Sequence, residues 1–401
     1  MNLYRNSLNG RILLPLSKSI SNRVLVMGAL SGQEIAAAEL SDSSDTAVMY
    51  EALHSEKRCF DIQDAGTAMR FLTAYLAQKK GVWEVTGSER MKQRPIGGLV
   101  EALNGLGARI EYKEQVGFPP LLIHGVPLEG GEVEIEASVS SQFVSALLLI
   151  APSMLRGLKI RLRGKVVSGA YIRMTMALMN AWGAEVCWGA EGIDIAAKPY
   201  RAKPYRVERD WSSASYFYEA MAIAGGSVIR FPGLWADSIQ GDAGQVELWE
   251  RLGVSTAFDE EGAVVTCSSS GGMRLEYDFT DMPDLVLSFA VACCMREVHF
   301  MFSGVETLRI KETDRIAALA QELKKLGYCL KMEGKERIVW EGEKCTPLNE
   351  VKIVTYNDHR MAMAFAPVGL KYKGLRIDDR MVVNKSFPTY WEELERVCVC
   401  G

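Results

Sequence analysis

The chain lacks any apolar run long enough to cross a membrane. Its longest runs, residues 146–152 and 285–295, fall well short of the roughly 20 residues that a transmembrane helix needs. The first fifteen residues also lack the continuous apolar core of a secretory signal. We therefore expect a cytoplasmic protein with no membrane partner.

Metal-binding patterns and excess positive charge are also lacking. The nine cysteines form no Cys-x-x-Cys motif, and with only four histidines no Cys/His ligand spacing occurs. This pattern predicts reduced thiols and no metal site. The formal net charge of −4 argues against a nucleic-acid partner, because such proteins are normally basic.

What the chain does have is a series of short polar clusters, each just ahead of a small-residue apolar run. Ser, Thr, Asp and Asn in that place are helix N-cap signals. A helix N-terminus offers unpaired N–H groups and the positive end of a dipole, so it suits phosphate and carboxylate. Because several clusters add Lys or Arg, they predict a site for a multiply anionic small molecule. The clusters lie at residues 18–23, 65–70, 140–142, 210–213, 311–315 and 357–360.

The same pattern of cap, helix, turn and strand recurs along the chain. Successive copies start 46, 74, 72, 71 and 74 residues apart, near Ser21, Thr67, Ser141, Ser213, Asp284 and Asp358. A second set of helices ends at Gly107, Gly183, Gly253 and Gly327, where glycine is the expected left-handed helix stop. Six copies predict an α/β fold of two lobes with three copies each. A generic multi-domain α/β protein is the alternative. Residues 197–206, a tandem Ala-Lys-Pro-Tyr-Arg, predict an extended linker.

The clusters together resemble the signatures of the 5-enolpyruvylshikimate-3-phosphate (EPSP) synthase family. The resemblance is collinear and covers essentially the whole chain. Its motifs are Leu-Ser-Lys-Ser-Ile-Ser-Asn-Arg at 16–23, Ala-Gly-Thr-Ala-Met-Arg at 65–70, Arg-Pro-Ile-Gly at 94–97, Ser-Val-Ser-Ser-Gln-Phe at 138–143, Lys-Glu-Thr-Asp-Arg at 311–315 and Asn-Asp-His-Arg-Met-Ala at 357–362.

The resemblance implies a two-lobed inside-out α/β barrel of six βαβαββ repeats. One lobe would comprise residues 18–209, and the other would combine residues 1–17 with 210–401. The resemblance places the active site in the cleft between them and implies closure when shikimate 3-phosphate binds.

The implied reaction transfers the enolpyruvyl group of phosphoenolpyruvate to the 5-hydroxyl of shikimate 3-phosphate and releases phosphate. It belongs to aromatic amino-acid (chorismate) biosynthesis and proceeds by addition and elimination through a tetrahedral intermediate. Such chemistry needs a cationic cage and an acid–base pair but no metal or other cofactor. The expected partners are these two small molecules, the expected state is a monomer, and glyphosate is the implied inhibitor, with sensitivity lost in Gly66→Ala.

The resemblance also assigns roles to residues. The catalytic group comprises Lys18, Asp284, Glu312 and His359. The phosphoenolpyruvate group comprises Lys18, Gly66, Arg94, Gln142, Arg315, Arg360 and Lys385. The shikimate 3-phosphate group comprises Ser19, Arg23, Ser140, Ser141, Gln142, Ser168, Tyr171, Asp284 and Lys311.

Several positions depart from the family pattern, and two of them bear on the choice of function. Asp64 stands where Asn or a small neutral residue is usual, and Thr307 stands where many members carry Asn. They keep open a non-catalytic ligand-binding relative. The second rival is the related UDP-N-acetylglucosamine enolpyruvyl transferase family. Residues 88–93 lack the Cys or Asp that this second family places before its Arg-Pro pair, so we expect the shikimate reaction.

Overall fold

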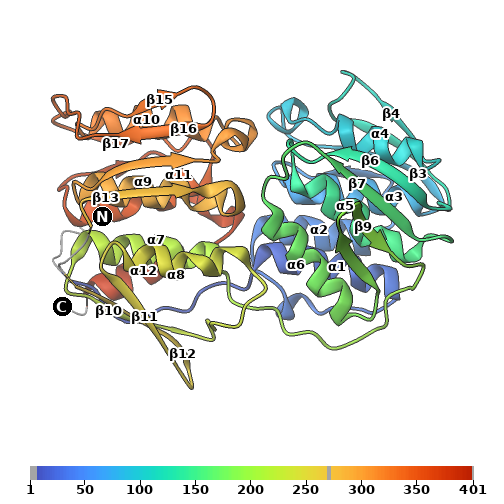
Figure 1. The fold of residues 1–401 in the computed structure, drawn as a ribbon, viewed down its shortest axis with the longest axis horizontal. Helices are drawn as coiled ribbons and strands as arrows, with labels where there is room; N and C mark the ends of the chain where they lie inside the picture. The colour runs from blue at the N-terminus through green and yellow to red at the C-terminus, as the bar shows by residue number, and fades with distance from the viewer. Residues whose placement is uncertain (1–6, 269–271, 400–401) are drawn as a thin grey trace. The chain divides into compact units, whose positions relative to one another are not determined.

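The computed structural model describes residues 7–268 and 272–399 and shows a mixed α/β protein (Figure 1). The chain divides into two compact units. The N-terminal unit is Ser17–Val207, and the C-terminal unit combines Met1–Leu16 with Glu208–Gly401. None of the described helices is both long enough and apolar enough to span a bilayer.

The N-terminal unit contains six α-helices and eight strands among its residues, all of which are described. Its helices are α1 (Lys18–Ser31), α2 (Ser44–His54), α3 (Gly66–Gln78), α4 (Gly97–Gly105), α5 (Ser141–Ile150) and α6 (Gly169–Ala181). Its strands are β2 (Cys59–Asp61), β3 (Gly81–Thr86), β4 (Arg109–Tyr112), β5 (Leu121–Gly125), β6 (Gly131–Glu136), β7 (Leu158–Arg163), β8 (Val186–Gly189) and β9 (Gly192–Ile195).

The described part of the C-terminal unit alternates helices and strands in the same way. Its helices are α7 (Trp211–Ala224), α8 (Gln245–Glu250), α9 (Val286–Met295), α10 (Arg315–Lys325), α11 (His359–Phe365) and α12 (Tyr390–Val399). Its strands are β1 (Asn9–Arg11), β10 (Val228–Pro232), β11 (Val254–Asp259), β12 (Gly262–Cys267), β13 (Arg274–Asp278), β14 (His299–Ser303), β15 (Lys331–Glu333), β16 (Arg337–Trp340), β17 (Lys352–Ile353) and β18 (Arg376–Ile377).

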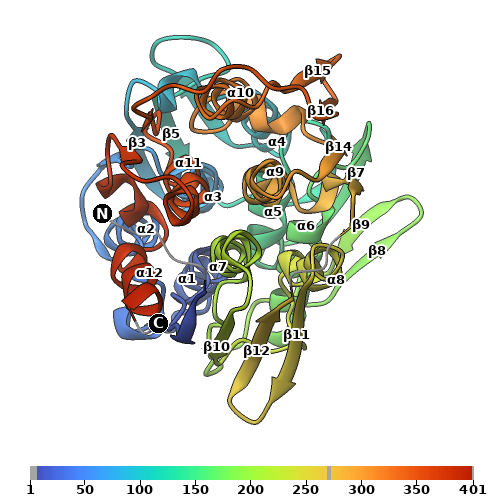
Figure 2. The same ribbon diagram turned by 90° about the vertical axis from the view of Figure 1, so that its left-hand side faces the viewer.

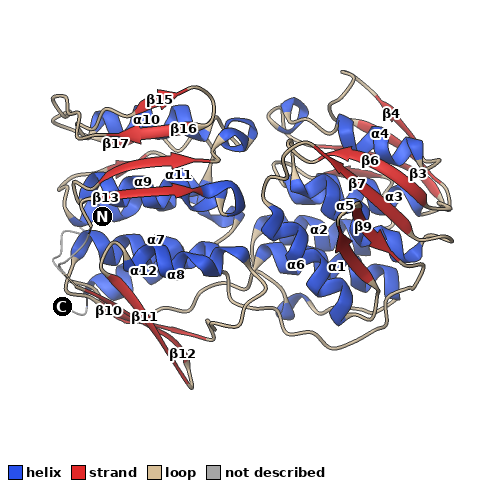
Figure 3. Cartoon of the chain, viewed as in Figure 1, coloured by secondary structure: helices blue, strands red, loops and turns tan. Residues whose placement is uncertain are grey.

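Four sheets, two in each unit, share one strand order. Figure 3 shows strands in red and helices in blue in both units. The orders of the four sheets are β2-β3-β5-β4, β6-β7-β9-β8, β1-β10-β12-β11 and β13-β14-β16-β15. In each, the first two strands are parallel and the remaining pairs are antiparallel. In the sheets that begin with β2, β6 and β13, one helix joins the parallel pair and a second leads into the closing hairpin. A further parallel pair, β17 and β18, flanks α11.

Each unit packs three helices against one another beneath its sheets. In the N-terminal unit these are α1, α3 and α5, and in the C-terminal unit they are α7, α9 and α11. Figure 2 shows the second trio nearly end-on, with sheets outside it. Helix α9 is buried at every position, because a helix covered on all sides needs no polar face. These central helices carry most of the predicted site residues at or near their N-terminal ends.

The predicted glycine stops are confirmed by the backbone. Gly107, Gly183, Gly253 and Gly327 have φ values of 95°, 82°, 77° and 96°, the left-handed conformation that glycine adopts without a Cβ penalty. The helix starts differ from the predicted positions by a few residues. Helix α1, for example, begins at Lys18 rather than near Ser21, because Ser17 supplies the N-cap.

Candidate active site

The first part of the N-terminal unit's site is the start of α1. The Ser17 side chain accepts a hydrogen bond from the backbone N–H of Ile20 and so caps the helix. Lys18, the first helical residue, places its Nζ 3.1 Å from Asp45 Oδ2. Asp45 lies in the first turn of α2 and is buried. The pair fixes the lysine at the N-terminal ends of two helices, where anions are attracted.

Gly66 and Arg94 lie directly against each other. A Cβ added to Gly66 would stand 2.7 Å from both terminal nitrogens of the Arg94 guanidinium, closer than non-bonded atoms allow. Arg70 fixes this arrangement, because its guanidinium donates to the carbonyl oxygens of Gly66 at 3.1 Å and Pro95 at 2.8 Å. Sequence reasoning assigned Arg70 no role, although it lies in a matched motif. The missing methyl group of Gly66 therefore makes room for Arg94 itself.

Gln142 extends the same cluster. Its side-chain amide donates to Thr67 Oγ1 at 3.2 Å, which links the start of α5 to the first turn of α3. Ser140 caps α5 by accepting from the backbone N–H of Gln142. Ser141, the first residue of α5, is buried. Thus Gly66, Arg94 and Gln142 belong to one contact cluster.

Arg23 organises a second cluster in the N-terminal unit. Its Nε donates to Thr175 Oγ1 at 2.7 Å, and its Nη1 donates to the Ser19 carbonyl at 2.8 Å. Its Nη2 donates to Ser145 Oγ and to the Tyr171 carbonyl. Burial among these neutral oxygens lowers the pKa of Arg23 to about 10, with Tyr171 acting weakly in the other direction. The guanidinium remains charged at neutral pH.

Ser168 joins this second cluster through the backbone. Its carbonyl accepts from the N–H of Tyr171, and it caps α6 with a φ of 54°. The predicted contacts Ser19, Arg23, Ser168 and Tyr171 are therefore connected to one another. The structure thus groups most of the predicted residues of this unit into two contact clusters.

Arg315 is the centre of the site residues in the C-terminal unit. Its Nε lies 2.7 Å from Asp358 Oδ2, its Nη1 lies 2.9 Å from Asp284 Oδ1, and its Nη2 lies 2.9 Å from Glu312 Oε2. Burial disfavours its charge, but the three carboxylates outweigh that effect and raise the pKa of Arg315. Their order of influence is Asp358, Glu312 and then Asp284.

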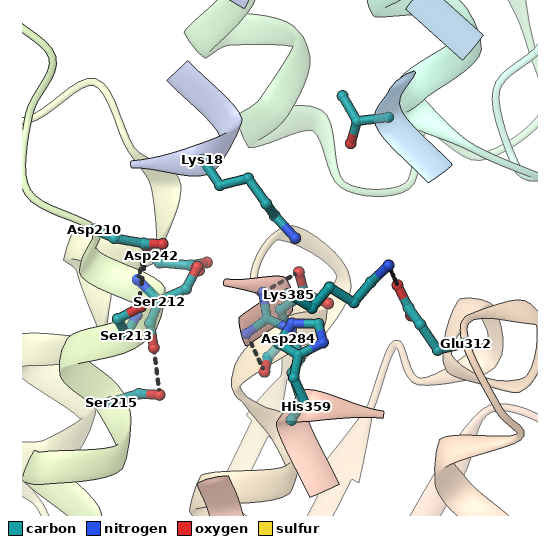
Figure 4. A network of polar contacts seen from close by, with 12 residues as sticks. Lys18, Asp210, Ser212, Ser213, Ser215, Asp242, Asp284, Glu312, His359 and Lys385 are labelled. Atoms are coloured by element: carbon teal, nitrogen blue, oxygen red, sulfur yellow. Dashed lines mark hydrogen bonds and ion pairs between the residues drawn. The ribbon is translucent and has the colours of Figure 1, made fainter. Parts of the chain in front are cut away.

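Asp284 is shared by two arginines, and Figure 4 shows it close to His359 and Lys385. Arg360 Nη2 lies 2.8 Å from its Oδ2, while Arg360 Nη1 donates to the buried Tyr216 hydroxyl at 3.1 Å. Burial raises the pKa of Asp284, yet Arg360, Lys311 and Arg315 together hold it well below its usual range. Asp284 is therefore a carboxylate at neutral pH.

The remaining predicted residues of this unit lie around Asp284 and its two arginines. Glu312 lies between two cations, with Lys385 Nζ 3.9 Å from its Oε1 and Arg315 on its other oxygen. Lys385 ends a short 3₁₀ helix, Met381–Lys385, and is buried. His359, the first residue of α11, is also buried, with Nδ1 3.7 Å from Asp358 Oδ1. Lys311, Asp284, Glu312, His359, Arg315, Arg360 and Lys385 thus form one electrostatic network.

Asp242 interacts electrostatically with Asp284, and sequence reasoning missed it. It is buried and accepts a hydrogen bond from the Ser212 hydroxyl, next to Asp210, which caps α7 (Figure 4). Burial and the nearby Asp284 raise the pKa of Asp242 to about 7, against the opposing effect of Ser212 and Arg360. Its only sequence signal is a Gly-Asp pair shortly before α8, which is too common to single out.

Asp64 and Thr307, which depart from the family pattern, occupy defined places. Asp64 accepts a hydrogen bond from the Ser88 hydroxyl, and Ser88 Oγ in turn accepts from the backbone N–H of Met91. Asp64 therefore helps fix the loop that leads to Arg94. Thr307 is buried within the 3₁₀ helix Glu306–Ile310.

Comparison with known proteins decides the family. The sequence profile described as EPSP synthase (3-phosphoshikimate 1-carboxyvinyltransferase) matches residues 53–394. The chain belongs to the EPSP synthase family. The first part of the chain, including Lys18 and Arg23, lies outside that match but inside the relatives described next.

Curated relatives extend the match to almost the full chain. The 3-phosphoshikimate 1-carboxyvinyltransferase of Bacteroides fragilis is 46% identical over 392 residues, which cover 98% of this chain and 96% of the relative. The protein of the same name from Pectobacterium carotovorum is 38% identical, with coverage of 97% and 96%. The EPSP synthase structure from Acinetobacter baumannii superposes with a TM-score of 0.75 at 21% identity, covering 98% of this chain and 96% of that one. This structural likeness confirms the mixed α/β fold of the family.

Proposed function

We propose that this chain transfers the enolpyruvyl group of phosphoenolpyruvate to the 5-hydroxyl of shikimate 3-phosphate, with release of phosphate. The observation that carries the proposal is the ion-pair network of the C-terminal unit. In it, Arg315 and Arg360 bind Asp284. Lys385 and Arg315 lie on either side of Glu312. It supplies both requirements of the reaction, cations for multiple anionic groups and carboxylates for proton transfer. Family membership identifies the substrates that need both.

For binding, we assign each contact cluster to one substrate. Phosphoenolpyruvate would draw on the cluster of Gly66, Arg94 and Gln142, with Lys18 and the C-terminal unit's Arg315, Arg360 and Lys385. Arginine suits this role because its planar fork binds carboxylate and phosphate through two parallel hydrogen bonds. The second substrate would draw on the Arg23 cluster, the α5 start and Lys311. The assigned residues of that group are Ser19, Arg23, Ser140, Ser141, Gln142, Ser168, Tyr171, Asp284 and Lys311.

For Arg23 the contacts favour a mixed role. Its described partners occupy four of its five N–H donors. It would therefore mainly hold Ser19 and Tyr171 in place, while its charge attracts the phosphate and carboxylate of shikimate 3-phosphate. A positioning role of this kind and a direct contact through the fifth donor are compatible.

For chemistry, we propose that Asp284 accepts the proton of the attacking 5-hydroxyl and that Glu312 exchanges a proton with the methylene carbon. Asp284 is a weak base while two arginines bind it, because its pKa lies well below the usual range. An anionic substrate that takes over Arg360 and Arg315 would remove that stabilisation, so the basicity of Asp284 would rise on binding. Lys18 would relay a proton, and His359 would support Asp358.

For architecture, we propose that the four repeated sheets belong to six βαβαββ copies in two inside-out barrel lobes. The lobes would be residues 18–209 and residues 1–17 with 210–401, and the substrates would recruit both to one active site. The parallel pair β17–β18 around α11 and the helices α1 and α2 are the natural candidates for incomplete copies. We further propose a cytoplasmic monomer.

Phosphate release measures the proposed activity directly. We expect release only when phosphoenolpyruvate and shikimate 3-phosphate are both present, in equal amount to the enolpyruvyl product. Omitting either substrate is the control. No release at millimolar concentrations of both substrates would contradict the proposal.

A further inference from the structure

The segment that leads into α11 has an unusual backbone. Tyr356 and Asn357 have φ values of 54° and 56°, two successive residues in the left-handed region. Asn tolerates that region, but for a bulky residue such as Tyr it is a genuine outlier. Such conformations persist only where surrounding contacts hold them. The residue that follows is Asp358, which binds Arg315.

Glu322 of α10 accepts hydrogen bonds from this turn and from the residues just before it. The Tyr356 hydroxyl donates to Glu322 Oε1 at 2.7 Å, and the backbone N–H of Val354 donates to Oε2 at 3.1 Å. Lys325 Nζ, one turn along the helix, lies 2.6 Å from the same Oε2. Glu322 itself is fully buried. A buried carboxylate with three donors forms strong, charge-assisted hydrogen bonds.

Helix α10 therefore binds residues 354–358 at two points. Arg315 and Glu322 are seven residues apart, which is two helical turns, so they share one face of α10. Arg315 holds Asp358 through Nε at 2.7 Å and Nη2 at 3.3 Å, and Glu322 holds Val354 and Tyr356. The left-handed turn lies between the two anchors.

Asp358 also positions Arg360. Asp358 Oδ1 caps α11 by accepting from the backbone N–H of Arg360 at 2.9 Å. Arg360 then reaches Asp284, which also binds Arg315. If the 356–357 turn relaxed to an ordinary conformation, Asp358 would move. Arg315 would then lose the carboxylate that positions it, and Arg360 would lose the backbone cap that positions it. A displacement of about 1 Å, caused by a change far from the reacting atoms, is enough to weaken binding.

We propose that Glu322 and Tyr356 are positioning residues for phosphoenolpyruvate binding. Their hydrogen bond holds the 356–357 turn, and the turn places the two arginines through Asp358. The inference rests on the proposed assignment of Arg315 and Arg360 to phosphoenolpyruvate. Neither Glu322 nor Tyr356 touches the substrate in this account.

The test removes one hydroxyl. In Tyr356→Phe we expect the KM for phosphoenolpyruvate to rise about tenfold, the lower end of the range expected for a lost hydrogen bond to a charged group. The KM for shikimate 3-phosphate should stay within a factor of about two, and Glu322→Gln, whose amide oxygen still accepts from Tyr356, should show a smaller rise.

Tyr372→Phe is the matched control. The Tyr372 hydroxyl donates to the Leu326 carbonyl, just after the C-terminal end of α10, at 3.2 Å, and among the described residues it makes no hydrogen bond to the 356–357 turn. We expect a thermal unfolding shift similar to that of Tyr356→Phe but an unchanged KM for phosphoenolpyruvate. Equal effects of the two Phe variants on that KM, or an equal rise for both substrates in Tyr356→Phe, would overturn the proposal.

Arg360→Lys separates this inference from the site assignment. If it leaves the KM for phosphoenolpyruvate unchanged, the assignment of the arginines is wrong. If it raises that KM while Tyr356→Phe does not, the assignment stands and the positioning role fails.

Discussion

Arg23 in the N-terminal unit and Arg315 in the C-terminal unit are stabilised in opposite ways. Arg23 donates to hydroxyl and carbonyl oxygens. In the C-terminal unit Arg315 faces three carboxylates. The electrostatic result differs in sign, because burial lowers the pKa of Arg23 to about 10 whereas the carboxylates raise that of Arg315.

This difference suggests a division of labour. A cation bound by neutral oxygens keeps its field available for an incoming anion, so the N-terminal unit is suited to attract phosphate and carboxylate groups. A cation bound by carboxylates is already neutralised, and an anion must displace those partners. The displaced carboxylates gain basicity, which suits proton transfer. In the proposed mechanism the Arg23 cluster would therefore attract shikimate 3-phosphate, while phosphoenolpyruvate binding at Arg315 and Arg360 would be coupled to proton transfer by Asp284 and Glu312.

The largest expected effect comes from Glu312→Gln. The amide keeps the shape of the side chain but cannot transfer the proton, so kcat should fall about 10²- to 10⁴-fold. Calorimetry should show shikimate 3-phosphate binding within about twofold of the wild type. Glu306→Gln, in the nearby 3₁₀ helix, is the control and should leave kcat unchanged. Strongly weakened shikimate 3-phosphate binding in Glu312→Gln would break the division of labour.

A smaller effect is expected in the N-terminal unit from Gly66→Ala. The added Cβ would stand 2.7 Å from the Arg94 guanidinium nitrogens, so Arg94 must move. We expect the KM for phosphoenolpyruvate to rise about tenfold, with glyphosate inhibition weakened in parallel and kcat changed less than KM. Gly98→Ala is the matched control, since its Cβ would meet only Phe143 ring atoms at 3.7 Å. A fall in kcat without a rise in KM would contradict the binding role.

The change expected at Asp242 concerns stability rather than activity. Its folded pKa of about 7 lies above the ordinary value, so between about pH 4 and 7 the folded state holds a proton that the unfolded state has lost. Stability therefore falls as pH rises through that window. Asp242→Asn removes this loss while still accepting from Ser212, so its stability relative to the wild type should increase by up to about 4 kcal/mol and level off above pH 7. Denaturant unfolding at several pH values measures the difference, and a pH-independent gap would contradict the raised pKa.

Much of the fold could be predicted because its signals are local and periodic. Ser17, Ser140, Asp210 and Asp358 each cap a helix, and glycine stops mark four helix ends. The sheet order could not be predicted in the same way, since β2 and β3 pair across an intervening helix and no local pattern records that pairing. The helix boundaries differ from the predicted ones by a few residues, because neighbouring polar residues compete as caps. In α1 the cap is Ser17 rather than Ser21.

The site shows a similar limit. The motifs identified Gly66 and Arg94 separately, but only the structure shows that a methyl group on Gly66 would strike Arg94. Asp242 and Glu322 were missed because their surroundings come from segments about 30 residues away, at Ser212 and Val354. A charged residue in a helix, such as Glu322, ordinarily indicates a solvent-exposed face. Burial and long-range partners therefore distinguish positions that composition and spacing cannot.

Proton transfer at the methylene carbon tests the central claim most directly. During turnover in D₂O with both substrates, the wild type should place deuterium in the enolpyruvyl methylene group, because addition gains a solvent-derived proton there and elimination loses one. NMR of that methylene measures the incorporation. We expect Glu312→Gln to bind shikimate 3-phosphate normally and to incorporate deuterium far more slowly. Incorporation at the wild-type rate in Glu312→Gln would contradict the assignment of proton transfer to the C-terminal unit's carboxylates.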